Sequence, residues 1–375
     1  MSGILIGDAM RLPLKDASVQ CAVTSPPYWG LRDYGIAPLV WGGDPACEHV
    51  WGEVERTPWA NAVPGPNGVV KNTVAGHWKP KEHGQWCRCS AWRGSLGLEP
   101  TPEFYVDHLV AVFREVRRVL RDDGTLWLNL GDSYNAYNGN AGPSSGFSAG
   151  SAADTERPHL ASGHGLRTKG LKPKDLVGIP WRVAFALQAD GWYLRSDIIW
   201  AKPNPMPESV TDRPTRAHEY LFLLSKSATY FYDREAISEP AVWGQPNSPE
   251  SIKSPYGQGF TRRSNNFNRL SHAEGSDERY VATEHSRRNR RSVWTIATEP
   301  YPEAHFATFP TDLVKPCVLA GSRVGDLVLD PFAGSGTVVL VAKDLGRHAI
   351  GVDLKPDYCQ LAMKRTRQHV LRLTP

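Results

Sequence analysis

The chain has 375 residues, 41% of them hydrophobic, which is enough for one large α/β domain and a smaller one. It contains no run of about 18 apolar residues and no charged leader before an apolar segment, so we expect a soluble, cytoplasmic protein with no membrane partner. Its six cysteines are too few for a disulfide framework. The formal net charge of +4 is small, and only its distribution along the chain is informative.

Two strands are predicted near the amino terminus, at residues 3–8 and 19–23. The second strand is apolar and β-branched, and the sequence Thr-Ser-Pro-Pro-Tyr-Trp follows it directly at residues 24–29. Loops at the ends of strands are where α/β proteins keep their chemistry. This loop is therefore the first candidate site.

The two prolines of the loop fix the backbone and donate no N–H, which leaves stiff carbonyl oxygens as acceptors. Ser25 adds an acceptor, and the ring of Tyr28 offers a flat face. A planar ligand with an exocyclic amino group suits these residues, because it can donate one hydrogen to Ser25 and one to the Pro26 carbonyl. The alternative interpretation is a proline-rich turn with a tyrosine packed on it.

Residues 38–95 are rich in tryptophan, proline and glycine without a regular period, and we interpret them as an inserted module. The module contains two close pairs of potential metal ligands, Cys47 with His49 and Cys87 with Cys89. Such a set suits a tetrahedral structural zinc ion in a segment with little core of its own. Because Cys-x-Cys departs from the usual Cys-x-x-Cys, His83 is an alternative ligand, and unligated thiols are the alternative to zinc.

The middle of the chain returns to regular patterns. A helix is predicted from residue 101 to the Asp-Asp-Gly sequence at 122–124, a strand at 125–130, a helix at 179–188 and a strand at 192–200. Residues 218–224 and 229–232 indicate an antiparallel hairpin. Residues 138–165 are rich in Gly, Ser and Ala, and they predict a mobile loop.

Arginines are concentrated in residues 262–291, which contain eight arginines and four acids and thus carry a charge of +4. Such a segment is typical of phosphate binding, and a solvated charge run is the alternative.

A second motif lies near the carboxyl end. A predicted strand at residues 326–330 runs into Pro-Phe-Ala-Gly-Ser-Gly-Thr at 331–337, and a helix pattern follows at 338–345. Glycines between a strand and a helix allow the backbone to approach a nucleotide-type ligand closely. The next strand, 348–352, ends in Asp353, an acid about 20 positions past the turn that is well placed for ribose hydroxyls.

Together, Ser-Pro-Pro-Tyr at 25–28 and Phe-x-Gly-x-Gly at 332–336 resemble the motifs of S-adenosylmethionine-dependent, amino-methylating DNA methyltransferases. The catalytic motif precedes the cofactor motif, as in the circularly permuted β class of that family. The resemblance implies an α/β fold: a Rossmann-like methyltransferase sheet with helices on both faces, a small inserted module and a target-recognition region.

The resemblance also implies site residues. Those of catalysis are Ser25, Pro26, Pro27 and Tyr28. Those of the cofactor site are Asp8, Phe309, Asp330, Phe332, Gly334, Gly336, Thr337 and Asp353. For Asp8, capping of the following turn is the alternative. Those of DNA binding are Lys202, Asn204, Arg262, Arg263, Arg287, Arg288, Arg290 and Arg291.

The expected organisation follows from these assignments. Residues 1–37, 96–233 and 299–375 form the catalytic domain, residues 38–95 the inserted module and residues 234–298 the target-recognition region.

The serine form of the catalytic motif is more typical of cytosine-N4 enzymes in this family, so we expect methyl transfer to the N4 amino group of a flipped-out cytosine. Adenine-N6 methylation is the first alternative. RNA or protein-glutamine methylation and an inactive DNA-binding protein are the others. Expected partners are double-stranded DNA and a cognate restriction endonuclease, with the chain as a monomer or homodimer.

Overall fold

The computed structural model describes residues 2–30, 33–54, 84–135, 170–172, 174–240, 287–299 and 310–368. The loop predicted at 138–165, His83, Arg262, Arg263 and Phe309 lie outside the described residues. The chain divides into two compact units, one formed by Met1–Asp233 with Arg291–Pro375 and the other by Arg234–Arg290.

An eight-stranded sheet forms the centre of the larger unit, in the order β1-β13-β12-β2-β6-β8-β7-β11. The strands are β1 (Gly3–Ile6), β2 (Val19–Thr24), β6 (Leu120–Leu130), β7 (Tyr193–Ala201), β8 (His218–Ser225), β11 (Val293–Thr295), β12 (Leu327–Asp330) and β13 (His348–Asp353). Among these strands only β8 runs opposite to the others. The predicted α/β class is confirmed, and the structure shows that the sheet is mostly parallel.

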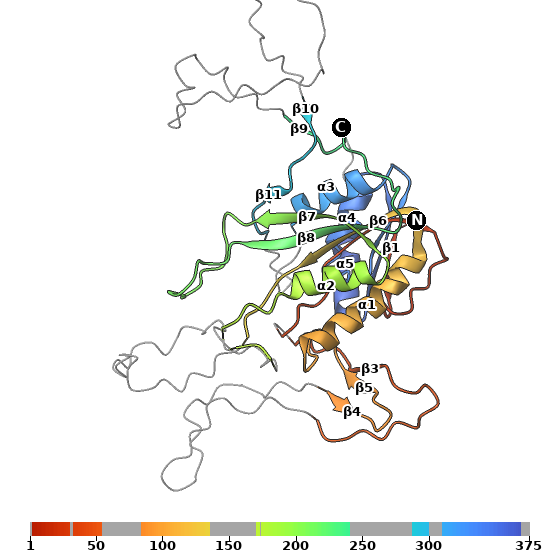
Figure 1. The fold of residues 1–375 in the computed structure, drawn as a ribbon. Coiled ribbons are helices and arrows are strands. Elements are labelled where there is room, and N and C mark those ends of the chain that lie inside the picture. Colours follow the sequence, from red (N-terminus) through yellow and green to blue (C-terminus); the bar gives the residue numbers. More distant parts are fainter. Residues whose placement is uncertain are drawn as a thin grey trace, which may run out of the picture. The chain divides into compact units, whose positions relative to one another are not determined.

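The helices pack on this sheet in two groups (Figure 1). They are α1 (Pro102–Val119), α2 (Ile179–Ala189), α3 (Thr311–Gly321), α4 (Thr337–Asp344) and α5 (Pro356–Gln368). Helix α1 packs beside α2, whereas α4 packs between α3 and α5. Thr101 begins α1 by accepting the Phe104 N–H at 3.2 Å, and a proline follows at the first helical position. No helix in the described part of the chain has the length and apolar character to cross a bilayer.

The strand β2 brings the two sequence motifs together. All six of its residues are buried, and it pairs in parallel with β12 on one side and with β6 on the other. Parallel neighbours end at the same edge of a sheet, so the loop after β2 and the glycine turn after β12 lie side by side although they are about 300 residues apart.

The described part of residues 38–95 forms a small antiparallel sheet of β3 (Leu39–Trp41), β5 (Trp92–Gly94) and β4 (Gln85–Trp86). Trp41 stacks on His108 of α1 at a centroid distance of 4.2 Å, and Trp92 lies 5.6 Å from Phe104. The smaller unit contains one described strand pair, β9 (Glu239–Pro240) with β10 (Arg287–Arg288).

Two expectations for single elements are wrong. The hairpin of residues 218–224 with 229–232 does not form, because β8 already has β6 and β7 as partners and the Phe231 N–H donates to the Asp123 carbonyl. The helix predicted to reach residues 122–124 ends at Val119, and β6 begins at Leu120 instead of 125.

Candidate active site

The loop after β2, residues 24–29 and called the catalytic loop below, meets two strands in a cluster of four polar side chains. The Tyr28 hydroxyl lies 2.7 Å from Asn129 Oδ1 on β6 and 2.7 Å from Glu219 Oε2 on β8. Ser25 Oγ lies 3.2 Å from the same Asn129 oxygen and 3.3 Å from the Tyr28 hydroxyl. The Asn129 amide donates to the Tyr220 carbonyl at 3.1 Å, which turns its oxygen toward the loop.

This cluster has more acceptors than protons. Ser25 and Tyr28 each have one hydroxyl hydrogen, whereas Asn129 Oδ1 and the Glu219 carboxylate together offer several lone pairs. Burial raises the pKa of Tyr28 well above its ordinary value, and the Glu219 charge raises it further, so Tyr28 stays protonated at neutral pH. The cluster is therefore suited to a ligand that brings N–H groups.

Glu219 also pairs with Lys202, through its other carboxylate oxygen. The Lys202 ammonium lies 4.3 Å from the centroid of the Trp200 ring, and both side chains of the ion pair are only 17% exposed. Lys202, expected as a DNA contact, thus lies next to the catalytic loop, where it balances the charge of a mostly buried carboxylate.

The two prolines have different surroundings. The Pro27 carbonyl accepts a hydrogen bond from the Tyr105 hydroxyl of α1 at 2.7 Å. No described residue donates to the Pro26 carbonyl. The indole N–H of Trp29 donates to the Glu99 carbonyl at 3.0 Å, so the loop is fixed on both sides of Tyr28 while one acceptor stays available.

The ring of Tyr28 rests on Gly131, the residue after β6. A Cβ atom at this position would lie 2.4 Å from a Tyr28 ring carbon, so only glycine fits without displacing the ring. Gly131 thereby holds one face of the tyrosine in place.

Asp330 connects the cofactor motif to the catalytic strand. Its Oδ1 accepts the Thr24 hydroxyl at 2.7 Å and the Phe332 N–H at 3.1 Å. Burial raises the pKa of Asp330 to about 7. A cationic amino group beside this carboxyl would favour its ionised form, which fits the expected contact with the amino group of a cofactor.

The turn after β12 is closed by Asp353. Its two carboxylate oxygens accept the N–H groups of Gly334 and Lys355, both at 2.9 Å. Gly334 and Gly336 have φ of +48° and +77°, and a Cβ on Gly336 would lie 2.8 Å from Ala362 of α5. The turn thus needs both glycines for its shape, and Asp353 keeps lone pairs for a further donor.

The side chains of Thr337 and Asp8 differ in their availability to a ligand. The Thr337 hydroxyl is buried and accepts from Arg365 at 2.8 Å, so only the backbone of Thr337 is left for a ligand. Asp8 Oδ1 accepts the Met10 N–H at 2.9 Å, which is the capping geometry given above as its alternative. Because β1 pairs with β13, Asp8 and Asp353 still lie at the same edge of the sheet.

The described residues expected to bind DNA have protein partners. Arg287 Nε donates to Ser238 Oγ at 2.5 Å, and Arg288 pairs with Glu239 at 2.9 Å, so both hold the β9–β10 pair together. Asn204 accepts the Thr298 N–H at 3.0 Å. Arg290 and Arg291 also have interactions within the chain.

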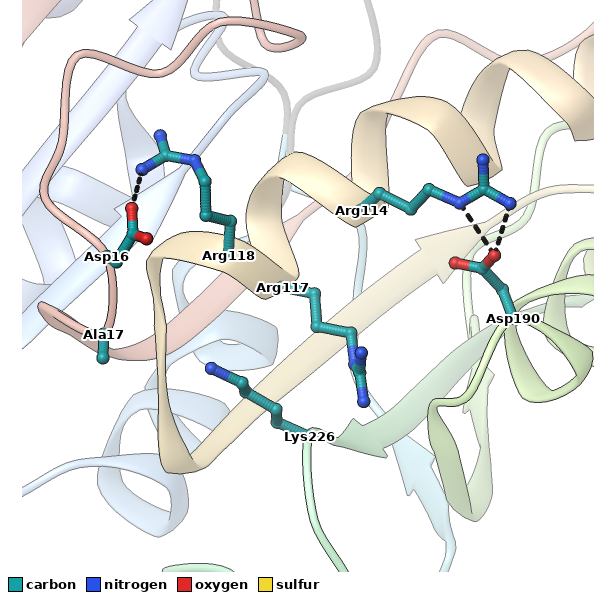
Figure 2. Close-up of a pocket in the computed structure, with 7 residues that line it drawn as sticks. All are labelled: Asp16, Ala17, Arg114, Arg117, Arg118, Asp190 and Lys226. Carbon is teal, nitrogen blue, oxygen red and sulfur yellow. Dashed lines mark hydrogen bonds and ion pairs between the residues drawn. The ribbon is translucent and has the colours of Figure 1, made fainter.

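A basic pocket lies at the opposite end of the sheet (Figure 2). It is lined by Asp16, Ala17, Arg114, Arg117, Arg118, Asp190 and Lys226. Arg114 pairs with Asp190 at 2.6 Å, and Lys226 pairs with Asp122 at 3.1 Å. Its position near the start of β2 and β6 separates it from both motifs.

Sequence reasoning did not identify three residues that touch the catalytic loop: Asn129, Glu219 and Tyr105. Asn129 is a polar residue within the buried, otherwise apolar run of residues 126–130, and Glu219 lies directly before the mostly buried, apolar run of residues 220–224 in β8. A polar residue in or next to a buried apolar run is a usable signal. Tyr105 is an aromatic residue at a helical core position and gives no such signal.

The chain matches the family of N6/N4-type DNA methylases over residues 19–364. It is 41% identical over 364 residues to the Type II methyltransferase M.Cfr9I of Citrobacter freundii, covering 96% of this chain and 85% of that one. It is 40% identical over 364 residues to M.SmaI of Serratia marcescens, covering 96% and 89%.

Solved structures share the fold. PvuII DNA methyltransferase (cytosine-N4-specific) superposes with a TM-score of 0.52 at 16% identity, over 97% of this chain and 86% of that one. The protein TTHA0409 of Thermus thermophilus, solved with S-adenosyl-L-methionine, gives 0.50 at 20% identity, over 100% and 96%. With its catalytic motif before its cofactor motif, the chain belongs to the β class of the S-adenosylmethionine-dependent, amino-methylating DNA methyltransferases.

Proposed function

We propose that this enzyme transfers a methyl group from S-adenosylmethionine to the N4 amino group of a cytosine flipped out of double-stranded DNA. The observation that carries the proposal is the set of acceptors at the end of β2. The Pro26 carbonyl has no donor among the described residues, and Ser25 Oγ lies within a cluster that has more acceptors than protons. An exocyclic amino group supplies the two missing N–H donors.

These acceptors also change the reactivity of the amino group. The lone pair of an exocyclic nitrogen is conjugated into the ring, and the nitrogen is therefore a poor nucleophile. Two acceptors, Ser25 Oγ and the Pro26 carbonyl, would accept hydrogen bonds from its two N–H groups. These bonds favour a pyramidal nitrogen with a directed lone pair. Asn129 and Tyr28 fix the Ser25 hydroxyl, so this geometry exists before the base enters.

The residues after β12 and β13 fit the cofactor. Gly334 and Gly336 open the turn, Asp353 offers carboxylate lone pairs for ribose hydroxyls, and Asp330 lies behind them in the direction of the catalytic loop. When bound, S-adenosylmethionine would supply a methyl group on a sulfonium whose sulfur leaves as a neutral thioether, and the methylated amino nitrogen would release one proton to solvent. No covalent intermediate on the enzyme is required.

The acceptor set suits cytosine N4 and adenine N6 chemically, and the choice of cytosine rests on Ser25. A serine at the first motif position is neutral, whereas an aspartate there would add charge beside Glu219.

A flipped base has to be held against the loss of its stacking, and Lys202, Asn204 and the arginines of 262–291 are the groups we assign to base and phosphate contacts.

Incubation with unmethylated genomic DNA and S-adenosylmethionine, followed by nucleoside mass spectrometry, tests the proposal. N4-methylcytosine is the expected product, and it should be absent with the Ser25→Ala variant. N6-methyladenine would refute the choice of base while leaving the roles of Ser25 and Pro26. If methyl groups enter RNA and not DNA, the proposed substrate is wrong. Co-purification with an endonuclease of the same sequence specificity would test the proposed restriction partner.

A further inference from the structure

A separate cluster of side chains lies in the small sheet formed by β3, β4 and β5. The ligand atoms of Cys47, His49, Cys87 and Cys89 all lie within 4.8 Å of one another. They come from two segments about 40 positions apart, and the catalytic motif contributes none of them. We propose that these four residues bind one structural zinc ion in each chain.

Two distances within the cluster match those of a tetrahedral site. Zn–S bonds of about 2.3 Å and Zn–N bonds of about 2.0 Å place two sulfur ligands about 3.8 Å apart, and a sulfur and a nitrogen about 3.5 Å apart. The structure has 3.8 Å between Cys47 Sγ and Cys87 Sγ, and 3.4 Å between Cys89 Sγ and His49 Nδ1. Both of these distances match a zinc tetrahedron, and all four ligand atoms lie within 4.8 Å of one another.

A disulfide does not account for this arrangement. The sulfur atoms of a disulfide are about 2.05 Å apart, far less than the 3.8 Å between Cys47 and Cys87, and all six cysteines of the chain are free thiols. A disulfide would also leave the approach of His49 to Cys89 unexplained. Three sulfurs and one imidazole nitrogen are the donor set of closed, structural zinc sites.

The backbone around the cysteines is shaped to hold thiolates. Cys87 and Cys89 lie on the tight turn between β4 and β5, where the Ser90 N–H donates to the Cys87 carbonyl at 3.0 Å and Ser90 has a φ of +66°. This turn places Cys87 Sγ 3.8 Å from Cys47 Sγ and Cys89 Sγ 3.4 Å from His49 Nδ1, so both cysteines of the turn face the other ligand pair.

The zinc ion adds to the contacts between two segments of the chain. The segment of Cys47 and His49 meets the β4–β5 region through the Trp51–Cys87 bridge, the Gly52 N–H to Trp86 carbonyl bond of 2.9 Å and the Gln85 side-chain amide, which donates to the Gly52 carbonyl at 2.9 Å. The two ligand pairs lie about 40 positions apart, and bringing them together costs conformational entropy. One metal ion with four ligands offsets that cost.

The sheet that carries the site packs on the part of α1 that supports the catalytic loop. Trp41 and Trp92 are buried against Phe104 and His108, and His108 Nδ1 lies 2.9 Å from the buried carboxylate of Glu99. Glu99 in turn accepts the Gly97 N–H at 2.8 Å and, at its carbonyl, the Trp29 indole. Zinc therefore supports the loop through packing and takes no part in methyl transfer.

The metal content of the full-length protein tests this proposal. Protein purified without chelators is expected to contain one zinc per chain by inductively coupled plasma mass spectrometry. The Cys87→Ser/Cys89→Ser double variant should lose this zinc. The matched control is Cys317→Ser, a buried cysteine of α3 whose Sγ donates to the Leu313 carbonyl at 3.2 Å, a bond that serine keeps. The control should retain one zinc per chain.

Cobalt exchange in the wild-type protein keeps the test decisive if the double variant does not fold. Tetrahedral Co²⁺ bound by cysteines is expected to give thiolate-to-cobalt charge-transfer and visible ligand-field absorption, which Zn²⁺ then abolishes. A reduced wild-type chain that contains no zinc and binds neither ion would overturn the proposal, and so would iron in place of zinc. The Tyr28→Phe variant should contain as much zinc as the wild type, so this test is independent of methylation.

Discussion

Replacement of Tyr28 by phenylalanine removes one oxygen atom and leaves the ring on Gly131. The lost hydroxyl donates to either Glu219 Oε2 or Asn129 Oδ1 and accepts from Ser25 Oγ. A hydrogen bond to a charged group contributes about 1.5 to 3 kcal/mol, and a neutral one about 0.5 to 1.5 kcal/mol. Part of this total orients Ser25, and we expect the rate constant for methylation to fall about 10- to 100-fold, equivalent to about 1.4 to 2.8 kcal/mol.

The assay is single-turnover transfer of a labelled methyl group to DNA, together with the Kd of S-adenosylmethionine from titration calorimetry. The Kd should change less than about twofold, because Tyr28 is absent from the contacts of the glycine turn. Tyr193→Phe is the matched control, since this tyrosine of β7 is 46% exposed. A Tyr28→Phe variant with the wild-type rate would show that Tyr28 acts through its ring alone, and the hydrogen-bond reasoning would be refuted.

Three other changes probe the site. Gly131→Ala places a Cβ 2.4 Å from the Tyr28 ring, so the rate of methylation should fall at least about tenfold. The control is Gly3→Ala, whose Cβ would have no atom within 4 Å and which should keep full activity. Equal rates for the two variants would contradict the steric argument. Asp353→Ala should raise the Kd of S-adenosylmethionine, measured by calorimetry, at least about tenfold. Replacement of the exposed Asp357 by alanine is the control and should leave the Kd unchanged. An unchanged Kd for Asp353→Ala would count against the ribose contact. Asp330 has its pKa raised from 3.8 to about 7, so the folded chain binds this proton more tightly than the unfolded chain. The stability of the wild type relative to Asp330→Asn should therefore fall as the pH rises from about 4 to about 7 and then stay constant; urea unfolding measures this difference, and a pH-independent difference would disprove it.

The fold was largely predictable because its signals are local. Apolar β-branched runs marked β2, β12 and β13, and glycine turns and helix caps marked their connections. The failed hairpin shows the limit of that reasoning. Residues 229–232 have a strand-like composition, but the order of strands in a sheet depends on partners far along the chain, and β7 and β6 had already occupied both edges of β8.

The candidate site could be predicted from the sequence only where a motif is contiguous. Ser25 to Tyr28 and the glycine turn each lie in one short segment, so their sequence reveals them. Asn129, Glu219 and Tyr105 reach the catalytic loop from β6, β8 and α1. For Asn129 and Glu219, the pairing of β6 with β8 decides which strand residues face the catalytic loop. That pairing is a property of the folded sheet, which the single sequence does not state.

The pairing of β2 with β12 has a consequence during synthesis of the protein. The catalytic loop leaves the ribosome early, but the strand that completes its sheet follows 306 positions later, as the Thr24 to Asp330 separation shows. At ordinary translation rates of about 5 to 20 residues per second, this interval lasts roughly 15 to 60 s. During that time one edge of β2 has no partner, and an unpaired buried strand is a site for aggregation. A nascent chain therefore carries the catalytic motif long before it can methylate anything, and its solubility depends on what shields that edge in the meantime.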